Sequence, residues 1–205
     1  MDLFLKTKEM ARKKEATGLK FYEISQSNSG GSFITNDKLC HRLFIEANSS
    51  TEADSIAEDL GCYWNGVDEG SDCPCCGDRW SGAYSAIDLT SMTREKDSSY
   101  PVEEWVDRKE SASEALEALK ERYSGFEWIK EPSIGEKYGS PVIGGLVKLN
   151  SIEDYAQVLA DQYGWTSPDA RIFYYDGSVK EIFSAKVEAS KQKDKKSKSK
   201  VDKIG

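Results

Sequence analysis

Three cysteines lie within a short acidic stretch of the chain, the segment DCPCCGD at residues 72–78. The spacing Cys-Pro-x-Cys-Gly, from Cys73 to Gly77, is typical of a zinc knuckle, in which a turn directs two thiolates at one metal ion. Gly77 suits the end of this turn because glycine adopts left-handed backbone conformations that other residues resist. Cys75 is expected to point away from the metal. The spacing therefore predicts a cysteine knuckle turn with Cys73 and Cys76 as metal ligands.

A structural zinc ion usually takes four ligands, so this knuckle needs two further donors. The candidates are Cys62, His41 and Cys40. Cys40 and His41 are neighbours on a predicted strand, where successive side chains point to opposite faces, so only one of them can face the metal. The sequence also favours a plainer role for His41, as a hydrogen-bonded histidine of the core. Structural zinc is the predicted cofactor, and its third and fourth ligands stay open.

Two other interpretations of the cysteines stay open: a reduced cluster of packed thiols, and a thiol that performs redox or nucleophilic chemistry. The odd number of cysteines, 5, argues against a disulfide framework. The single histidine excludes any site that needs two imidazoles. The sequence contains neither a phosphate-binding glycine loop nor a nucleophile elbow. We therefore predict no catalytic residue and favour a protein that is not an enzyme.

Carboxylates surround the cysteines, at Asp68, Glu69, Asp72 and Asp78. They could collect Mg²⁺ or Ca²⁺, but the spacing of an EF-hand loop is absent, so we interpret them as a solvated acidic loop. The motif Asp-Arg-Trp that ends at Trp80 predicts an ion pair beside a buried indole. We expect this indole to anchor the cysteine turn on a sheet.

Capping signals and apolar periodicity predict the elements that must position the turn. Three helices each follow a serine and end at a glycine, the usual residues of a helix N-cap and a left-handed C-cap. An Asp-Gly turn between two β-rich runs predicts a hairpin. We also expect the glycine pair 144–145 to interrupt its strand and Tyr163 to face inward. The predicted helices cover 49–60, 111–123 and 151–163, and the predicted extended segments cover 20–25, 32–35, 38–47, 62–64, 126–130, 142–149, 171–175 and 178–185.

Helices mixed with hairpins predict an α+β fold, with a mostly antiparallel sheet and helices packed on one side. We expect a single domain over residues 20–185, with a candidate subdomain break within 81–110, where a long surface connection is predicted. Residues 1–19 are expected to form a peripheral basic helix. The lysine-rich tail, 186–205, has too few apolar side chains to offset the entropy of ordering it, so we predict that it is disordered.

The formal net charge of −8 is unevenly distributed. Residues 186–205 carry +5 and residues 1–20 carry +3, which leaves −16 for residues 21–185. An acidic body of this kind repels phosphates and suits a partner protein with a basic surface, although ordinary solvation also explains it. The tail could attract nucleic acid weakly, but it has no arginine or aromatic side chain to stack on bases. No apolar run approaches the ~20 residues that span a bilayer, so we expect no membrane association.

The strings FYEISQSNSGGSF, LCHRLFIEA, CPCCGDRW and DARIFYYDGSVKEI resemble those of an uncharacterised family of tailed-bacteriophage proteins. The resemblance runs from about Phe21 to Lys186, and CPCCGDRW is its most specific string. It implies a phage accessory protein in the cytoplasm of an infected bacterial host. Together with the charge, it leads us to expect a non-enzymatic acidic protein for host takeover, which binds or inhibits a host protein such as a defence-system component. The alternative is a metal- or thiol-dependent enzyme centred on the cysteine cluster and His41.

Overall fold

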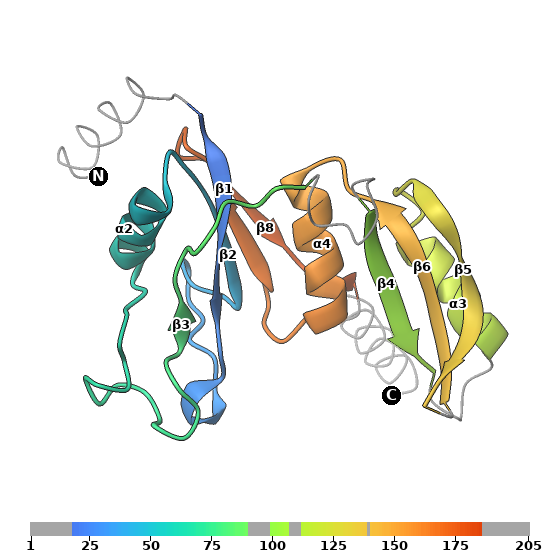
Figure 1. Ribbon diagram of the computed structural model, residues 1–205, viewed down its shortest axis with the longest axis horizontal. Helices are drawn as coiled ribbons and strands as arrows, with labels where there is room; N and C mark the ends of the chain where they lie inside the picture. Colours follow the sequence, from blue (N-terminus) through green and yellow to red (C-terminus); the bar gives the residue numbers. More distant parts are fainter. Residues whose placement is uncertain (1–17, 90–98, 107–111, 139, 186–205) are drawn as a thin grey trace, which may run out of the picture. The chain divides into compact units, whose positions relative to one another are not determined.

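The computed structural model describes residues 18–89, 99–106, 112–138 and 140–185 (Figure 1). Most of the predicted N-terminal helix and the whole lysine-rich tail lie outside these residues. The described residues form two compact units. Unit 1 runs up to Ile87 and resumes at Gly164, and unit 2 lies between Asp88 and Tyr163. The first boundary falls inside the stretch 81–110, where we placed the candidate break in an otherwise single domain.

The fold is α+β, as predicted, with two mostly antiparallel sheets and helices packed on them. The sheet of unit 1 has the strand order β3-β1-β2-β7-β8, and its neighbours are antiparallel except for the parallel pair β2 and β7. Its strands are β1 (Lys20–Gln26), β2 (Arg42–Ala47), β3 (Trp80–Ser81), β7 (Ala170–Phe173) and β8 (Val179–Ile182). The pairing of β7 with β8 confirms the predicted hairpin.

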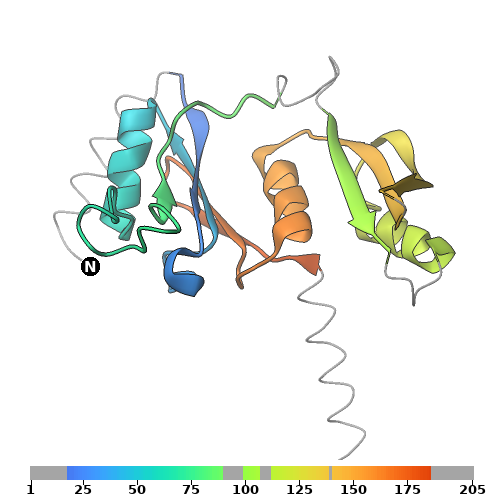
Figure 2. The same cartoon turned by 60° about the horizontal axis from the view of Figure 1, so that its bottom comes forward.

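Helix α2 (Ser50–Leu60) lies against one face of the unit 1 sheet (Figure 1, Figure 2). Both of its predicted caps are confirmed: the Ser49 side chain accepts a hydrogen bond from the Glu52 N–H, and Gly61 has a left-handed φ of 111°. Ala53 and Ala57 are buried against the sheet. The core between helix and sheet contains the apolar side chains Ile24, Leu39, Leu43, Ile45 and Ala47.

Strand β2 begins at Arg42 and not at the predicted residue 38, and neither 32–35 nor 62–64 forms a strand. A buried side chain replaces part of the expected ladder. The Gln26 amide donates hydrogen bonds to the carbonyl oxygens of Ile34 and Cys40 and accepts one from the Ile34 N–H. The segment before β2 is therefore ordered by a side chain, which strand periodicity does not reveal.

Unit 2 contains an antiparallel sheet with the order β4-β6-β5. Its elements are β4 (Ser99–Trp105), α3 (Ala112–Arg122), β5 (Trp128–Lys137), β6 (Ser140–Lys148) and α4 (Ile152–Tyr163). Tyr100 and Trp128 both pair with Val147 and so point to the same face. Tyr100 contacts Tyr155 of α4, and Trp128 contacts Tyr123 at the end of α3, so both helices pack on that face.

Three predictions for unit 2 were wrong. The stretch expected to be a surface connection contains β4, an edge strand whose proline and glutamates weaken its strand signal. The glycine pair does not interrupt β6; the irregularity lies in β5, whose register shifts opposite the pair, between Lys130 and Ser133. At Gly145 a Cβ would lie 2.7 Å from the Lys130 carbonyl oxygen, so glycine lets β5 approach closely there. Tyr163 is 42% exposed instead of facing inward.

Candidate functional site

The loop that joins α2 to β3 carries the three clustered cysteines. We call residues 65–79 the cysteine loop. Within it the N–H groups of Cys76 and Gly77 donate to the Cys73 carbonyl oxygen over 3.0 and 3.1 Å. Gly77 has a φ of 79°, the left-handed conformation expected for the glycine of this turn. The backbone therefore forms a tight turn around Cys73.

The three thiols of this turn lie together. The sulfur of Cys73 is 2.8 Å from that of Cys75, which is 3.6 Å from that of Cys76, and all three fall within 4.8 Å of one another. The expectation that Cys75 points away was wrong. The residues of this turn do not alternate between two faces as strand residues do, so a cysteine between two others can share their side. The cluster therefore offers three sulfur ligands and could bind a metal ion.

The thiols also influence one another's protonation. The pKa of Cys73 lies below its ordinary value, mainly because Cys75 hydrogen-bonds to its sulfur, with further help from backbone N–H groups and from Cys76. The same hydrogen bond raises the pKa of Cys75 to about 11. The Cys73 sulfur thus carries negative charge more readily than that of Cys75, as the first ligand to a soft cation must.

The structure does not bring the other two cysteines into this cluster. Cys40 and Cys62 are buried in the core under α2, and the Cys40 thiol donates to the Arg42 carbonyl oxygen over 3.1 Å. Burial raises the pKa of each of these thiols to about 12. Among the residues that the structure describes, the one metal-ligating group of three or more consists of Cys73, Cys75 and Cys76.

His41 also lies away from the cluster, in the core of unit 1. It is 2% exposed and packs between the rings of Phe33 and Trp165, with centroid separations of 5.0 and 4.8 Å. Its Nδ1 lies 3.4 Å from the buried carboxylate of Asp169. The position is that of a core histidine.

An ion pair braces the base of the cysteine loop. Asp72 accepts hydrogen bonds from the Tyr63 hydroxyl at 2.9 Å and the Arg79 N–H at 2.7 Å, and the Arg79 Nε lies 3.3 Å from it. The Arg79 guanidinium also donates to the carbonyl oxygens of Ser29 and Ser32. The Asp-Arg-Trp motif predicted an ion pair between Arg79 and its neighbour Asp78. Arg79 instead pairs with Asp72.

Sequence patterns do not reveal this network, because its members are far apart in the chain. The residue in the sequence that relates to this network is Gly66, since no side chain fits at its position. A Cβ there would lie 2.2 Å from an oxygen of Asp72 and 2.6 Å from the Tyr63 ring. A second connection runs through Ser29, whose hydroxyl accepts from the Cys73 N–H and donates to the Gly77 carbonyl oxygen. The cysteine turn is thus attached to the short helical turn Ser29–Gly31.

Trp80 anchors the other end of the loop, as predicted. It is 4% exposed and belongs to the same core cluster as Ile24 and Leu43. Its backbone pairs with Gln26 of β1, so β3 adds a short edge strand to the sheet. The loop is therefore fixed at both ends, while the thiols of Cys75 and Cys76 stay exposed.

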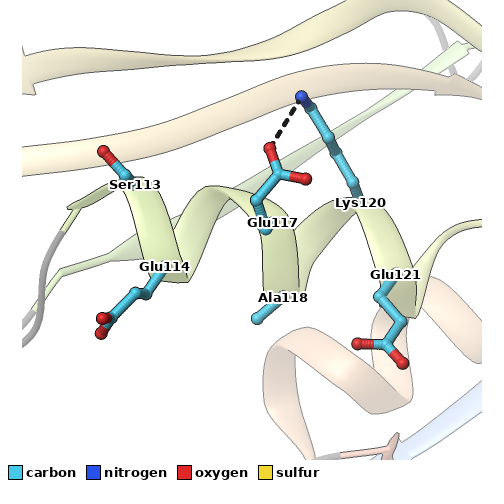
Figure 3. A pocket seen from close by; sticks show the side chains of 6 residues that line it. All are labelled: Ser113, Glu114, Glu117, Ala118, Lys120 and Glu121. Atoms are coloured by element: carbon cyan, nitrogen blue, oxygen red, sulfur yellow. Dashed lines mark hydrogen bonds and ion pairs between the residues drawn. The ribbon is translucent and has the colours of Figure 1, made fainter.

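A separate hollow on the outer side of α3 gathers exposed charged side chains (Figure 3). Glu117 forms an ion pair with Lys120 at 3.1 Å. Glu114 and Glu121 point away from this pair (Figure 3). These carboxylates do not converge on one point, so the hollow has the character of a solvated helix surface.

Comparison with known proteins places the chain in a family. No curated protein and no solved structure matches it. Among the residues that the structure describes, no helix combines the length and the apolar character needed to cross a membrane. A family model described as a domain of unknown function, DUF7296, matches residues 19–130, more than half of the chain. The matched region contains the whole cysteine loop, and the chain belongs to the DUF7296 family.

Proposed function

We propose that this protein is a non-enzymatic binding protein in which Cys73, Cys75 and Cys76 hold a zinc ion that stabilises the cysteine loop as part of a surface for a basic partner protein. The observation that carries the proposal is the convergence of three thiols on an exposed turn whose two ends are fixed.

The donor set fits zinc. Thiolates are soft ligands that select zinc, copper(I) and iron–sulfur clusters over magnesium or calcium, and a turn closed by backbone N–H groups suits a zinc knuckle. Three sulfurs fill three of the four positions that zinc prefers. The fourth is then open to water or to a side chain of the partner.

The surroundings of the cysteines favour binding over catalysis. The chain's single histidine is buried between Phe33 and Trp165, so it offers the thiols no general base. A zinc ion with three thiolates is also a weaker Lewis acid than one with three neutral imidazoles, because the sulfur ligands neutralise its charge.

The charge of the loop favours a basic partner. Asp68, Glu69 and Asp78 are exposed. The only basic residue between 65 and 79 is Arg79, which is buried and bonded to Asp72 and to backbone carbonyl groups. The loop therefore presents uncompensated negative charge to its surroundings, which accelerates and selects association with a positive surface.

We further propose that the partner is a host protein of an infected bacterium, such as a component of a defence system, and that the binding takes place in the host cytoplasm as part of host takeover. The resemblance of CPCCGDRW and three other strings to tailed-bacteriophage proteins supports this context. The lysine-rich tail would add at most a weak attraction for nucleic acid.

The experiment is affinity capture of partners from bacterial lysate by the full chain, with bound proteins identified by mass spectrometry. We expect one specific partner, retained at ~0.05 M salt and released at ~0.5 M salt, because the screening length falls several-fold over this range. Chelation of zinc and the Cys73→Ser variant should each abolish capture. Deletion of residues 186–205 should not.

Two results would contradict the proposal. If capture is unchanged by chelation and by Cys73→Ser, the zinc loop is not part of the binding surface. If no partner appears and the reduced protein instead turns over a thiol, disulfide or nucleic-acid substrate in a manner that requires the cysteines, the enzyme alternative is correct.

A further inference from the structure

A cavity of about 250 Å³ lies beside the cysteine loop in unit 1. Trp64, Trp80 and Tyr84 contribute aromatic walls, and Asp54 and Asp78 contribute carboxylates. We call this cavity the tryptophan pocket. Its volume is below the ~300–1,000 Å³ of sites for drug-sized molecules, so it suits a single side chain better than a cofactor.

Within the described residues, neither carboxylate of the tryptophan pocket forms an ion pair with a cationic side chain. One oxygen of Asp54 accepts from the Ala83 N–H at 2.7 Å, and one oxygen of Asp78 accepts from the Val67 N–H at 2.9 Å. The adjacent Arg79 guanidinium is turned to Asp72 and to backbone carbonyl groups.

The aromatic walls add attraction for a cation. Tyr84 is 88% exposed, so its ring is available to a ligand. Trp80 is buried, so the rings that a ligand can reach are those of Trp64 and Tyr84. A cation over an aromatic face is attracted by the ring's electrons, and more strongly as water is excluded.

We infer that the tryptophan pocket binds an arginine side chain of the partner protein. A guanidinium is planar, stacks on aromatic rings and bonds carboxylates with a fork of donors, whereas the lysine ammonium is a compact, strongly hydrated charge. The inference rests on the proposed function in that the arginine is the anchor of the basic partner.

The test uses the full ¹⁵N-labelled chain and two short peptides, acetyl-Gly-Arg-Gly-amide and the same peptide with neutral citrulline in place of arginine. Binding is followed through the indole N–H signals of Trp64 and Trp80. We expect the arginine peptide to shift both signals, and the citrulline peptide to bind at least about tenfold more weakly. The Asp54→Asn/Asp78→Asn variant should also bind the arginine peptide at least about tenfold more weakly.

Asparagine keeps the Oδ1 acceptor of each aspartate, so the double variant should retain the folded loop. Tyr84→Ala, which changes an exposed side chain, provides a second variant that should weaken arginine binding without unfolding. The matched control is Glu114→Gln/Glu121→Gln, which removes two exposed charges of α3 outside the tryptophan pocket and should leave the peptide affinity unchanged.

The inference is wrong if citrulline and arginine peptides bind equally, or if the Asp54→Asn/Asp78→Asn and Tyr84→Ala variants both bind the arginine peptide like the wild type. The same variants separate this inference from the proposed function. Partner capture that survives the double variant would overturn the tryptophan pocket alone. Arginine binding without any captured partner would overturn the proposed function alone.

Discussion

At the scale of single residues, the five cysteines divide into two chemical classes. Cys40 and Cys62 are buried, and burial raises the pKa of each thiol to about 12. Cys73, Cys75 and Cys76 lie on a turn, where hydrogen bonds between thiols lower the pKa of Cys73. The thiols suited to reaction or to metal binding are therefore those of the cysteine loop, because the thiolate is the form that reacts and binds.

We predict that a thiol-specific alkylating reagent at pH 8 modifies three cysteines of the reduced, metal-free chain and spares Cys40 and Cys62. A pKa of about 12 leaves a thiolate fraction of roughly 10⁻⁴ at this pH, and burial also excludes the reagent. The pKa of Cys75 is raised too, to about 11, but this thiol is exposed to the reagent, so we expect it to react after Cys73. Intact mass and peptide mapping over time provide the measurement. Unfolding the chain should expose all five. Early modification of Cys40 or Cys62 in the folded chain would contradict this division.

Gly66 provides a second prediction at this scale. A Cβ there would collide with Asp72 and Tyr63 and displace the carboxylate that braces the loop. We expect Gly66→Ala to cost about 1–3 kcal/mol of stability, as overpacking does, and to weaken zinc binding at least about tenfold. Chemical denaturation and a competitive zinc titration measure the two effects.

Gly70→Ala is the matched control for this prediction. Gly70 has a left-handed φ of 73°, but a Cβ at this position would have no neighbouring atom within 4 Å. The substitution should cost about 1–2 kcal/mol through the backbone alone and leave zinc affinity unchanged. Equal zinc affinities of the two variants would show that the Asp72 brace does not position the cysteines.

At the scale of elements, local signals predicted what local forces determine. Ser49 and Gly61 define the ends of α2 because both caps bond groups within the same helix. The hairpin of β7 and β8 was equally clear from its Asp-Gly turn. Strand β4 was missed because it depends on pairing with β6, about forty positions away in the chain, and contains a proline. The Asp72–Arg79 brace was missed because it depends on Tyr63 and on carbonyl groups of 29 and 32.

The prediction at this scale concerns strand β3. Trp80 is buried against the sheet and fixes the C-terminal end of the cysteine loop. We expect Trp80→Ala to destabilise the whole of unit 1 by about 3–5 kcal/mol, the usual cost of removing a core tryptophan. Hydrogen exchange of β1 and β2 amides, together with denaturant melts, measures this loss.

The control for Trp80 is the double variant Asp68→Asn/Glu69→Gln, which changes exposed charges on the same loop. Its stability should stay within ~0.5 kcal/mol of the wild type. If Trp80→Ala were equally stable but lost partner binding, Trp80 would act as a contact residue and not as an anchor.

At the scale of the whole molecule, the net charge predicts a basic partner but not the place where such a partner would bind. The charge of −16 over residues 21–185 is spread through the sequence. The structure gives part of it a location, because Asp54 and Asp78 line one pocket while the nearby Arg79 is turned inward. The cysteines were predicted as a site from their spacing. Only the path of the chain shows that Cys75 joins them and that Cys40 and Cys62 are buried elsewhere. The burial of His41 agrees with the core role that the sequence favoured.

The most direct test of the proposed function counts the zinc ions bound by the reduced full chain, by mass spectrometry under non-denaturing conditions. We predict about one ion per chain, because one cluster supplies the sulfur ligands. Cys73→Ser, Cys75→Ser and Cys76→Ser should each reduce occupancy and lower the melting temperature of the zinc-loaded protein, since the binding free energy of a structural site adds to folding. Cys62→Ser should keep its zinc. A wild-type chain that binds no zinc, or a triple serine variant that retains it, would contradict the account.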